Sequence, residues 1–223
     1  TGQFIFVASP ARRRGEKAKE PPKFRIINKI SAPEVELPSK HTIAVFSLSE
    51  GGTLYFNDIR RFGYLKLVRD VDIPHVRELA EFGPEPLSKA FTFQVFSEHV
   101  RRHPSQAIKT TLMDSRVIAG IGNIYSDEIL FHAAVAPLRK VKTLSEDELR
   151  HIFQHIRPVL EKGIAAKGSS VGDFVRTDGS WGTMGKFHYV YGRKGQKCKK
   201  CKATLMAVKV GGRTGTFCPS CQR

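Results

Sequence analysis

Cysteine is scarce in this sequence and is confined to one end of it. The chain has four cysteines among 223 residues, and all of them lie within the last 26. No other cysteine suggests an oxidising compartment. The sequence also shows no secretory signal and no apolar run near the roughly 20 residues that a membrane span needs. We therefore expect a soluble, intracellular protein.

Acidic residues are missing from one long stretch. Gly179 to Arg223 contains no aspartate or glutamate, but it contains ten lysine and arginine residues. Over the whole chain, 37 Lys and Arg against 21 Asp and Glu give a formal net charge of +16 and a pI near 9.9. So many uncompensated cations favour a polyanionic partner, and nucleic acid is the expected one.

The cysteines form two Cys-x-x-Cys pairs at a spacing that is typical of zinc sites. Cys198 pairs with Cys201, Cys218 pairs with Cys221, and sixteen residues separate the two pairs. Each pair can present two thiolates from one tight turn, so two pairs complete a tetrahedron around Zn²⁺. The alternative is two disulfides. One tightly bound structural zinc ion is expected.

The residues between the pairs predict a β-hairpin. Residues 204–210 and 213–217 read as strands, and Gly211-Gly212 supplies the turn. A hairpin of this size does not fold on its own, so the metal would fasten its open ends.

The first part of the chain has the pattern of β-strands. A short apolar run at 4–7 precedes a long loop over about 9–40 that is rich in Pro, Lys, Arg and Glu. Segments 41–49, 53–57 and 62–68 then read as strands linked by turns. They predict an antiparallel meander with too few strands to complete a sandwich or barrel.

The middle of the chain predicts helices. Residues 74–82 and 88–102 read as two short ones. Ser145-Glu146-Asp147-Glu148 has the spacing of a capping box and opens a longer helix, which Pro158 should bend. The apolar stripe of this helix is Leu149, Ile152, Ile156, Leu160 and Ile164.

A glycine-bearing turn lies between these helices. Residues 108–130 read as a short helix, a turn at Gly120 to Asn123, and a second helix that begins near Ile124. Two glycines let the turn approach a partner closely, and the amides of the new helix with the Asn123 side chain can bind a phosphate. A turn that only packs two helices together is the alternative.

Together these motifs closely resemble the formamidopyrimidine-DNA glycosylase family, bacterial enzymes that remove oxidised purines from DNA. The resemblance covers nearly the whole chain. It rests on motifs in a fixed order, which are 57–63 (NDIRRFG), 83–87 (GPEPL), 108–109 with 112–114 (IK, LMD), 120–125 (GIGNIY), 191–195 (YGRKG) and the four cysteines.

The resemblance implies an α+β fold. A glycine-rich loop at about 168–186 corresponds to the loop that closes over the lesion, and Trp181 there would touch the base or pack beneath it. The implied parts are a partial antiparallel β-sandwich at 1–73, including the 9–40 loop, a helical domain at 74–180 with the helix-two-turns-helix motif at about 108–134, and a zinc-finger hairpin at 186–223.

The resemblance also implies which residues contact DNA. Lys109 and Asn123 correspond to phosphate ligands, while Arg60 and Phe62 correspond to the pair inserted where the lesion nucleotide is flipped out. Arg213 corresponds to the hairpin arginine that assists strand cleavage. His41, Arg102 and Tyr191 are further expected DNA contacts, and Arg102 replaces a basic residue of the family whose place Pro104 takes.

Each of these residues also has a plain structural interpretation. Phe62 could be strand core, Arg60 a solvated edge charge, and Lys109 an ordinary surface lysine. His41 carries the least specific signal of all.

The implied function is base-excision repair by a bifunctional DNA glycosylase and AP lyase. Its expected partner is duplex DNA with oxidised bases or abasic sites, and the protein is expected to be a monomer of the bacterial cytoplasm, associated with the nucleoid. The family begins with Pro-Glu, whereas this chain begins Thr1-Gly2-Gln3. We therefore expect a fragment that is inactive by itself for want of a nucleophile. The alternatives are a non-catalytic damage-binding protein and an oxidised-pyrimidine glycosylase.

Overall fold

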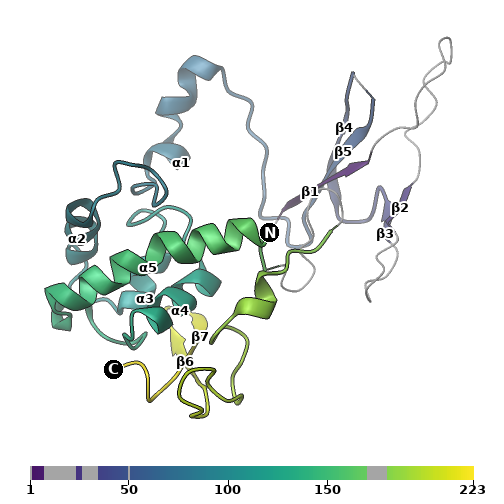
Figure 1. Cartoon of the computed structure of the whole chain (residues 1–223). Helices are drawn as coiled ribbons and strands as arrows, with labels where there is room; N and C mark the ends of the chain where they lie inside the picture. The colour runs from purple at the N-terminus through teal and green to yellow at the C-terminus, as the bar shows by residue number, and fades with distance from the viewer. Residues whose placement is uncertain (1, 8–23, 27–34, 50, 170–179) are drawn as a thin grey trace, which may run out of the picture. The chain divides into compact units, whose positions relative to one another are not determined.

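The computed structural model describes residues 2–7, 24–26, 35–49, 51–169 and 180–223. The chain forms two compact units (Figure 1). One comprises Thr1–Leu67 with Ala166–Gly185, and the other comprises Val68–Ala165 with Lys186–Arg223. Contacts thus group the zinc hairpin with the helices, while the three-domain division stays a prediction.

The first unit is built on a three-stranded antiparallel sheet. Its strands are β1 (Gln3–Val7), β4 (Thr42–Ser47) and β5 (Thr53–Asn57), and they lie in the order β1-β5-β4. Strand β5 is central because it pairs with β1 on one side and β4 on the other. The strands expected at 41–49 and 53–57 are thereby confirmed.

A small core lies against this sheet. Ile5 of β1 and Tyr55 of β5 meet Leu37, and all three side chains are buried. Leu37 ends β3 (Val35–Leu37), which pairs with β2 (Phe24–Ile26) in a separate antiparallel ribbon. The sheet and the ribbon are the partial β-structure that the sequence indicates.

The strand expected at 62–68 does not form. Residues 61–69 have no regular structure, and the chain before them turns around the buried carboxylate of Asp58. Its Oδ1 accepts the N–H of Arg60 at 3.0 Å, and its Oδ2 accepts the N–H of Gly63 at 2.6 Å. The motif at 57–63 is therefore a loop wound around one carboxylate.

The second unit packs helices around one apolar core and adds the hairpin. No helix of the described residues is long and apolar enough to cross a membrane. Its elements, in which η marks a 3₁₀ helix, are η1 (Asp70–His75), α1 (Arg77–Ala80), α2 (Phe93–Arg101), α3 (Ile108–Met113), α4 (Asn123–His132), η2 (Val141–Thr143), α5 (Glu146–Ala165), β6 (Met206–Val210) and β7 (Arg213–Phe217). The short η3 (Met184–Phe187) spans the boundary between the two units.

Two expected helices are shorter than the sequence suggests. Residues 74–82 give only the end of η1 and the four-residue α1, neither of which buries a side chain. Helix α2 begins at Phe93 instead of Ser88, because Thr92 caps it by accepting the Val95 N–H at 3.3 Å. Packing and capping, more than periodicity, set these boundaries.

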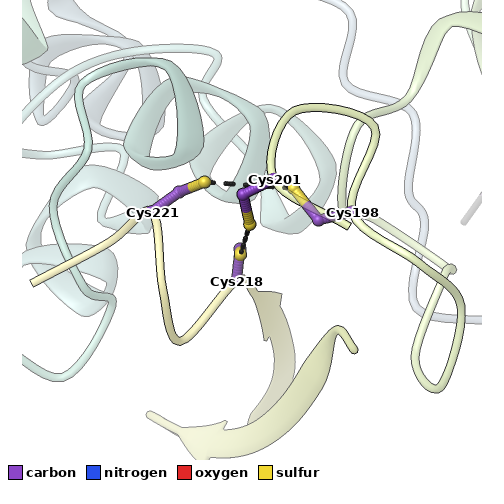
Figure 2. Close-up of side chains that lie close together, drawn as sticks. All are labelled: Cys198, Cys201, Cys218 and Cys221. Atoms are coloured by element: carbon purple, nitrogen blue, oxygen red, sulfur yellow. Dashed lines mark hydrogen bonds between the residues drawn. The ribbon is translucent and has the colours of Figure 1, made fainter. Parts of the chain in front are cut away.

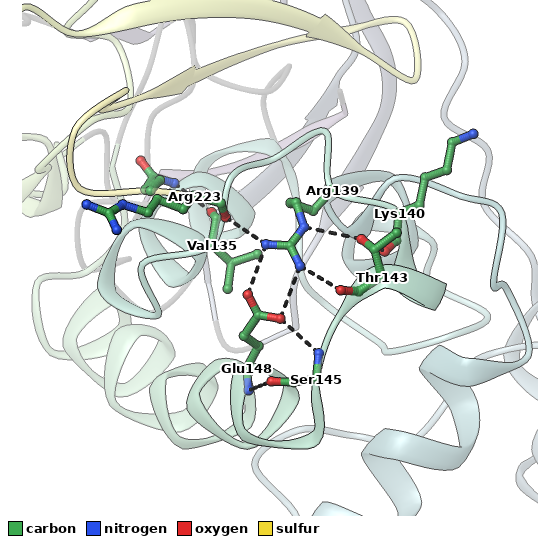
Figure 3. A network of polar contacts seen from close by, with 8 residues as sticks. Val135, Arg139, Lys140, Thr143, Ser145, Glu148 and Arg223 are labelled. Atoms are coloured by element: carbon green, nitrogen blue, oxygen red, sulfur yellow. Dashed lines mark hydrogen bonds and ion pairs between the residues drawn. The ribbon is translucent and has the colours of Figure 1, made fainter.

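The capping box of α5 is confirmed. Ser145 Oγ accepts the N–H of Glu148 at 3.1 Å, and the Glu148 carboxylate accepts the N–H of Ser145 at 2.8 Å (Figure 3). The apolar stripe is buried from Leu149 to Leu160. The expectation for Ile164 was wrong, since it is 63% exposed in the last turn, beyond the core.

Candidate metal centre and nucleic-acid interface

The four cysteines converge in space. Cys198 and Cys201 precede the hairpin, Cys218 and Cys221 follow it, and all four sulfurs lie within 4.8 Å of one another (Figure 2). Cys198 Sγ is 4.0 Å from Cys221 Sγ, and Cys201 Sγ is 3.4 Å from Cys218 Sγ. Sulfurs bound tetrahedrally to zinc at about 2.3 Å lie about 3.8 Å apart, so the cluster fits this ion.

The surroundings of the sulfurs also suit a metal thiolate site. All four cysteines are free thiols, which excludes the disulfide alternative in this structure. The Lys200 N–H lies 3.4 Å from Cys198 Sγ as a donor. The Ala203 N–H helps to lower the pKa of Cys201 to about 7, whereas burial raises the pKa of Cys221 to about 12. A divalent cation would favour the thiolate at every position.

The hairpin is the one that the sequence predicts, shortened by two residues at its start. Strands β6 and β7 pair antiparallel, with Val210 opposite Arg213. Gly211 and Gly212 have φ values of 54° and 74°, which a two-residue type I′ turn requires. A Cβ on Gly211 would lie 2.8 Å from Thr110 Oγ1, so the turn rests directly on α3. Arg213 follows this turn and is exposed.

Strand β7 runs alongside α4 in the same direction. The Thr216 N–H donates to Asp127 Oδ2 at 2.9 Å, and Cys218 packs in one cluster with Phe131. Residues later in β7 therefore lie beside residues later in α4. The opposite end of β7, which carries Arg213, must lie toward the N-terminus of α4, where Asn123 stands.

Asn123 is the first residue of α4. Its Oδ1 is buried and accepts no hydrogen bond within the described part of the chain. The preceding turn is open, because a Cβ on Gly120 or Gly122 would meet nothing within 4 Å. The Asn123 Nδ2 and the N–H groups at this helix terminus are donors of the kind that bind a phosphate.

Lys109 does not have the position that was expected of it. Its side chain is 0% exposed, and its Nζ lies 2.6 Å from Asp127 Oδ1. The same ammonium donates to Asn123 O at 3.2 Å and Ser126 Oγ at 3.0 Å. Burial lowers the pKa of Lys109 and raises the pKa of Asp127, while their attraction opposes both shifts. With its donors in use inside the protein, Lys109 holds the Asn123 turn instead of contacting a phosphate.

The residue after Asp127 anchors the segment that leads to the zinc centre. Glu128 is buried, and its carboxylate accepts the N–H groups of Tyr189, Val190 and Tyr191 at 2.8–3.0 Å. Sequence reasoning missed Asp127 and Glu128. Their signal was an adjacent acidic pair directly before the apolar run Ile129-Leu130-Phe131, in a chain with no acidic residue after Asp178.

The motif at 191–195 is a turn that Arg193 holds together. Its guanidinium donates to Tyr189 O, to Lys197 O at 2.9 Å and to Gln196 Oε1 at 3.0 Å. Tyr191 is half-buried, and it leads into this turn. Arg102 is exposed and caps the C-terminus of α2.

Three expected DNA contacts lie in the first unit. Phe62 is 78% exposed, so it is not strand core, and the Arg60 guanidinium carbon stands 5.9 Å from the centre of its ring. His41 is half-buried just before β4, where its carbonyl accepts the Asp58 N–H at 2.9 Å. The central part of the expected lesion loop, 170–179, lies outside the described residues, and the role of Trp181 stays a prediction.

Two family models match the chain. Residues 82–175 match the one described as formamidopyrimidine-DNA glycosylase H2TH domain, and residues 195–223 match a zinc finger found in FPG and IleRS. The formamidopyrimidine-DNA glycosylase of Desulfitobacterium hafniense (strain Y51) is 42% identical over 185 residues, which cover 83% of this chain and 67% of that protein. Its counterpart from Thermus thermophilus is 41% identical over 187 residues, covering 83% and 69%.

Solved structures of Fpg proteins are also similar to this chain. The crystal structure of MutM (Fpg) from Thermus thermophilus is 40% identical with a TM-score of 0.77, and the match covers 83% of this chain and 70% of that one. A complex between Lactococcus lactis Fpg and DNA containing an abasic site is 29% identical with a TM-score of 0.79, covering 100% and 72%.

Proposed function

The chain belongs to the formamidopyrimidine-DNA glycosylase family, and we propose that its described residues hold duplex DNA around a damaged nucleotide. Its function is accordingly that of a base-excision repair enzyme, a DNA glycosylase and AP lyase that acts on oxidised purines. Cys198, Cys201, Cys218 and Cys221 hold one structural zinc ion, which orders the hairpin and takes no part in the chemistry.

One observation carries the proposal, namely that Asn123 and Arg213 lie at the same end of α4. Asn123 is the first residue of the helix, and the hairpin turn next to Arg213 rests on Thr110 of α3. A neutral donor, helix-terminal N–H groups and a guanidinium together suit a bent phosphate backbone. We assign Asn123 to a phosphate and Arg213 to the backbone at the lesion.

The first unit supplies the insertion element. Arg60 and Phe62 project together from the Asp58 loop, with the guanidinium near the ring face. An exposed aromatic ring on a fixed loop can fill the gap that a flipped-out nucleotide leaves, and a planar guanidinium can bond the orphaned base. His41 and Tyr191 complete the proposed DNA contacts, and Arg102 is a further candidate.

The substrate follows from the relatives. Lactococcus lactis Fpg has been solved with DNA containing an abasic site and with DNA containing Fapy-dG. We propose that the present chain binds the same classes of damaged duplex, as a monomer, in the cytoplasm of a bacterium.

The test is binding to a duplex that carries a stable abasic-site analogue, compared with the undamaged duplex. Wild type should prefer the abasic duplex. Asn123→Ala removes a hydrogen bond to a charged group and should weaken its binding roughly tenfold. Arg213→Ala should weaken it similarly and lower the slope of log affinity against log salt by about one, whereas Asn123→Ala leaves that slope unchanged. Equal affinity of wild type for both duplexes would contradict the proposal.

A further inference from the structure

Gln222 is a buried polar side chain that the DNA contacts and the zinc centre do not explain. It is 3% exposed, although glutamine is normally a surface residue. Its Oε1 accepts the N–H of Cys218 at 2.8 Å, and its Nε2 donates to Val135 O at 2.9 Å. Its own N–H donates to Cys218 O at 3.1 Å.

These contacts link the metal centre to the helices. Gln222 holds both backbone polar groups of Cys218, the zinc ligand that directly follows β7. The Val135 carbonyl belongs to the connection between α4 and α5, where Ala134 has a φ of 60°. One carboxamide therefore joins the base of the hairpin to a fixed point on the helical core.

The neighbouring residue strengthens the same link. The Arg223 N–H donates to Ala134 O at 3.1 Å, and Arg223 O accepts the Ala136 N–H at 2.9 Å. Arg223 O also accepts a bond from Arg139, whose guanidinium binds Glu148 of the α5 capping box (Figure 3). The link thus extends from a zinc ligand to the first turn of the longest helix.

We propose that Gln222 is a positioning residue which, through Val135, fixes the base of β7 and so sets where Arg213 stands at its other end. This inference rests on the proposed contact of Arg213 with DNA. The middle of β7 is held by Asp127 and its turn by Thr110. Without the Gln222 side-chain bonds, the base of the strand is held less firmly to the helices, and the strand can tilt so that Arg213 shifts relative to Asn123.

Two substitutions separate the two bonds of the carboxamide. Gln222→Met keeps the length of the side chain and removes both bonds. Gln222→Glu keeps an acceptor for the Cys218 N–H and, while its carboxylate is ionised, places an oxygen without a proton to donate against Val135 O. Gln154→Met, at an exposed position of α5, is the matched control.

The experiment is a double-mutant cycle with Arg213→Ala, in which binding to the abasic-analogue duplex is measured on zinc-loaded protein. In wild type and in Gln154→Met, Arg213→Ala should weaken binding by the same factor. In Gln222→Glu and Gln222→Met that factor should shrink at least about twofold, which is the coupling of residues that act together. Zinc release to a chelator should be near wild type in Gln222→Glu and faster in Gln222→Met.

The outcomes are distinct. If Arg213→Ala weakens binding equally in every background, Gln222 supports the fold alone and the inference is overturned, while the proposed function stands. If Arg213→Ala has no effect even in wild type, the proposed role of Arg213 fails first. Should Gln222→Met lose its zinc, Gln222→Glu decides, because its bond to Cys218 is intact.

Discussion

At the scale of single residues, Lys109 shows how burial changes the meaning of a side chain. A lysine beside a phosphate-binding turn was expected to contact DNA, but its ammonium pairs with Asp127 inside the protein. It supports the turn by donating to Asn123 O. Lys109 therefore supports the proposed DNA interface from inside the protein and does not lie on its surface.

Replacing Lys109 should lower the free energy of unfolding, because the side chain is part of the buried framework and not of the DNA-contacting surface. Lys109→Met leaves the Asp127 carboxylate buried without its cation, which should cost about 3–5 kcal/mol of unfolding free energy. Lys109→Met with Asp127→Asn should recover part of this loss, because an amide can still accept the Thr216 N–H. Urea denaturation measures the free energy of unfolding of the single and the double variant. A loss below about 1 kcal/mol for the single variant would show that the pair is not the buried contact described here.

Phe62 is the residue whose exposure most directly suggests a function. An aromatic ring that is 78% exposed adds nothing to a core, so Phe62→Ala should leave thermal stability unchanged. It should also leave the affinity for undamaged duplex nearly intact and weaken selectivity for the abasic duplex, since only the damaged site has a gap for the ring. Equal losses of affinity for the two duplexes would make Phe62 a structural residue.

At the scale of elements, the segment at Gly83 and Pro84 clamps the turn that precedes α4. The Gly83 N–H donates to Ser115 O at 2.8 Å, and Pro84 O accepts the Ala119 N–H at 3.2 Å. A Cβ on Gly83 would lie 2.6 Å from the backbone of Val117, so no larger residue fits. The motif at 83–87 thus shapes the Gly120 turn from outside the helix-two-turns-helix segment.

Gly83→Ala should therefore destabilise the second unit by about 1–3 kcal/mol, the usual cost of overpacking against atoms that cannot move aside. Gly122→Ala is the matched control, because a Cβ there meets nothing within 4 Å and the backbone is not left-handed. Thermal melting should separate the two variants by several degrees. Coincident melting curves would show that the 114–119 segment can yield to the added methyl group.

At the scale of the whole chain, the metal decides whether the hairpin exists. The cluster beside the cysteines contains few buried apolar side chains, among them Val190 and Leu205, so metal coordination supplies much of the order. Treatment with a strong chelator and a reductant should melt residues 195–223 and leave the larger helical core folded. Affinity for the abasic duplex should fall at least as far as in Arg213→Ala.

The check is circular dichroism together with zinc content and DNA binding after chelation and after zinc is restored. We expect the circular dichroism signal and the affinity for DNA to recover when zinc is added. Full affinity in the zinc-free protein would contradict the view that the hairpin positions Arg213.

Local signals identified much of the fold and of the site. The cysteine spacing, the two glycines of the hairpin turn and the capping box at Ser145 each depend on neighbours in sequence, and all three are confirmed. The predictions of a strand at 62–68 and of a helix start at Ser88 were wrong. Thr92 caps α2, and Asp58 accepts the N–H of Gly63 at the start of the expected strand, and hydrophobic periodicity detects neither side-chain bond.

The sequence by itself determined the zinc ligands, the hairpin and the family, because local spacing and an ordered set of motifs carry that information. Only the tertiary structure decided which charged and polar side chains face inward. Lys109, Asp127, Glu128 and Gln222 look like surface residues in the sequence, yet each is buried by partners at least 18 residues away or by the packing of α4 against β7. Such partners meet only after the chain has folded, because the burial that makes their bonds strong is itself a product of the fold.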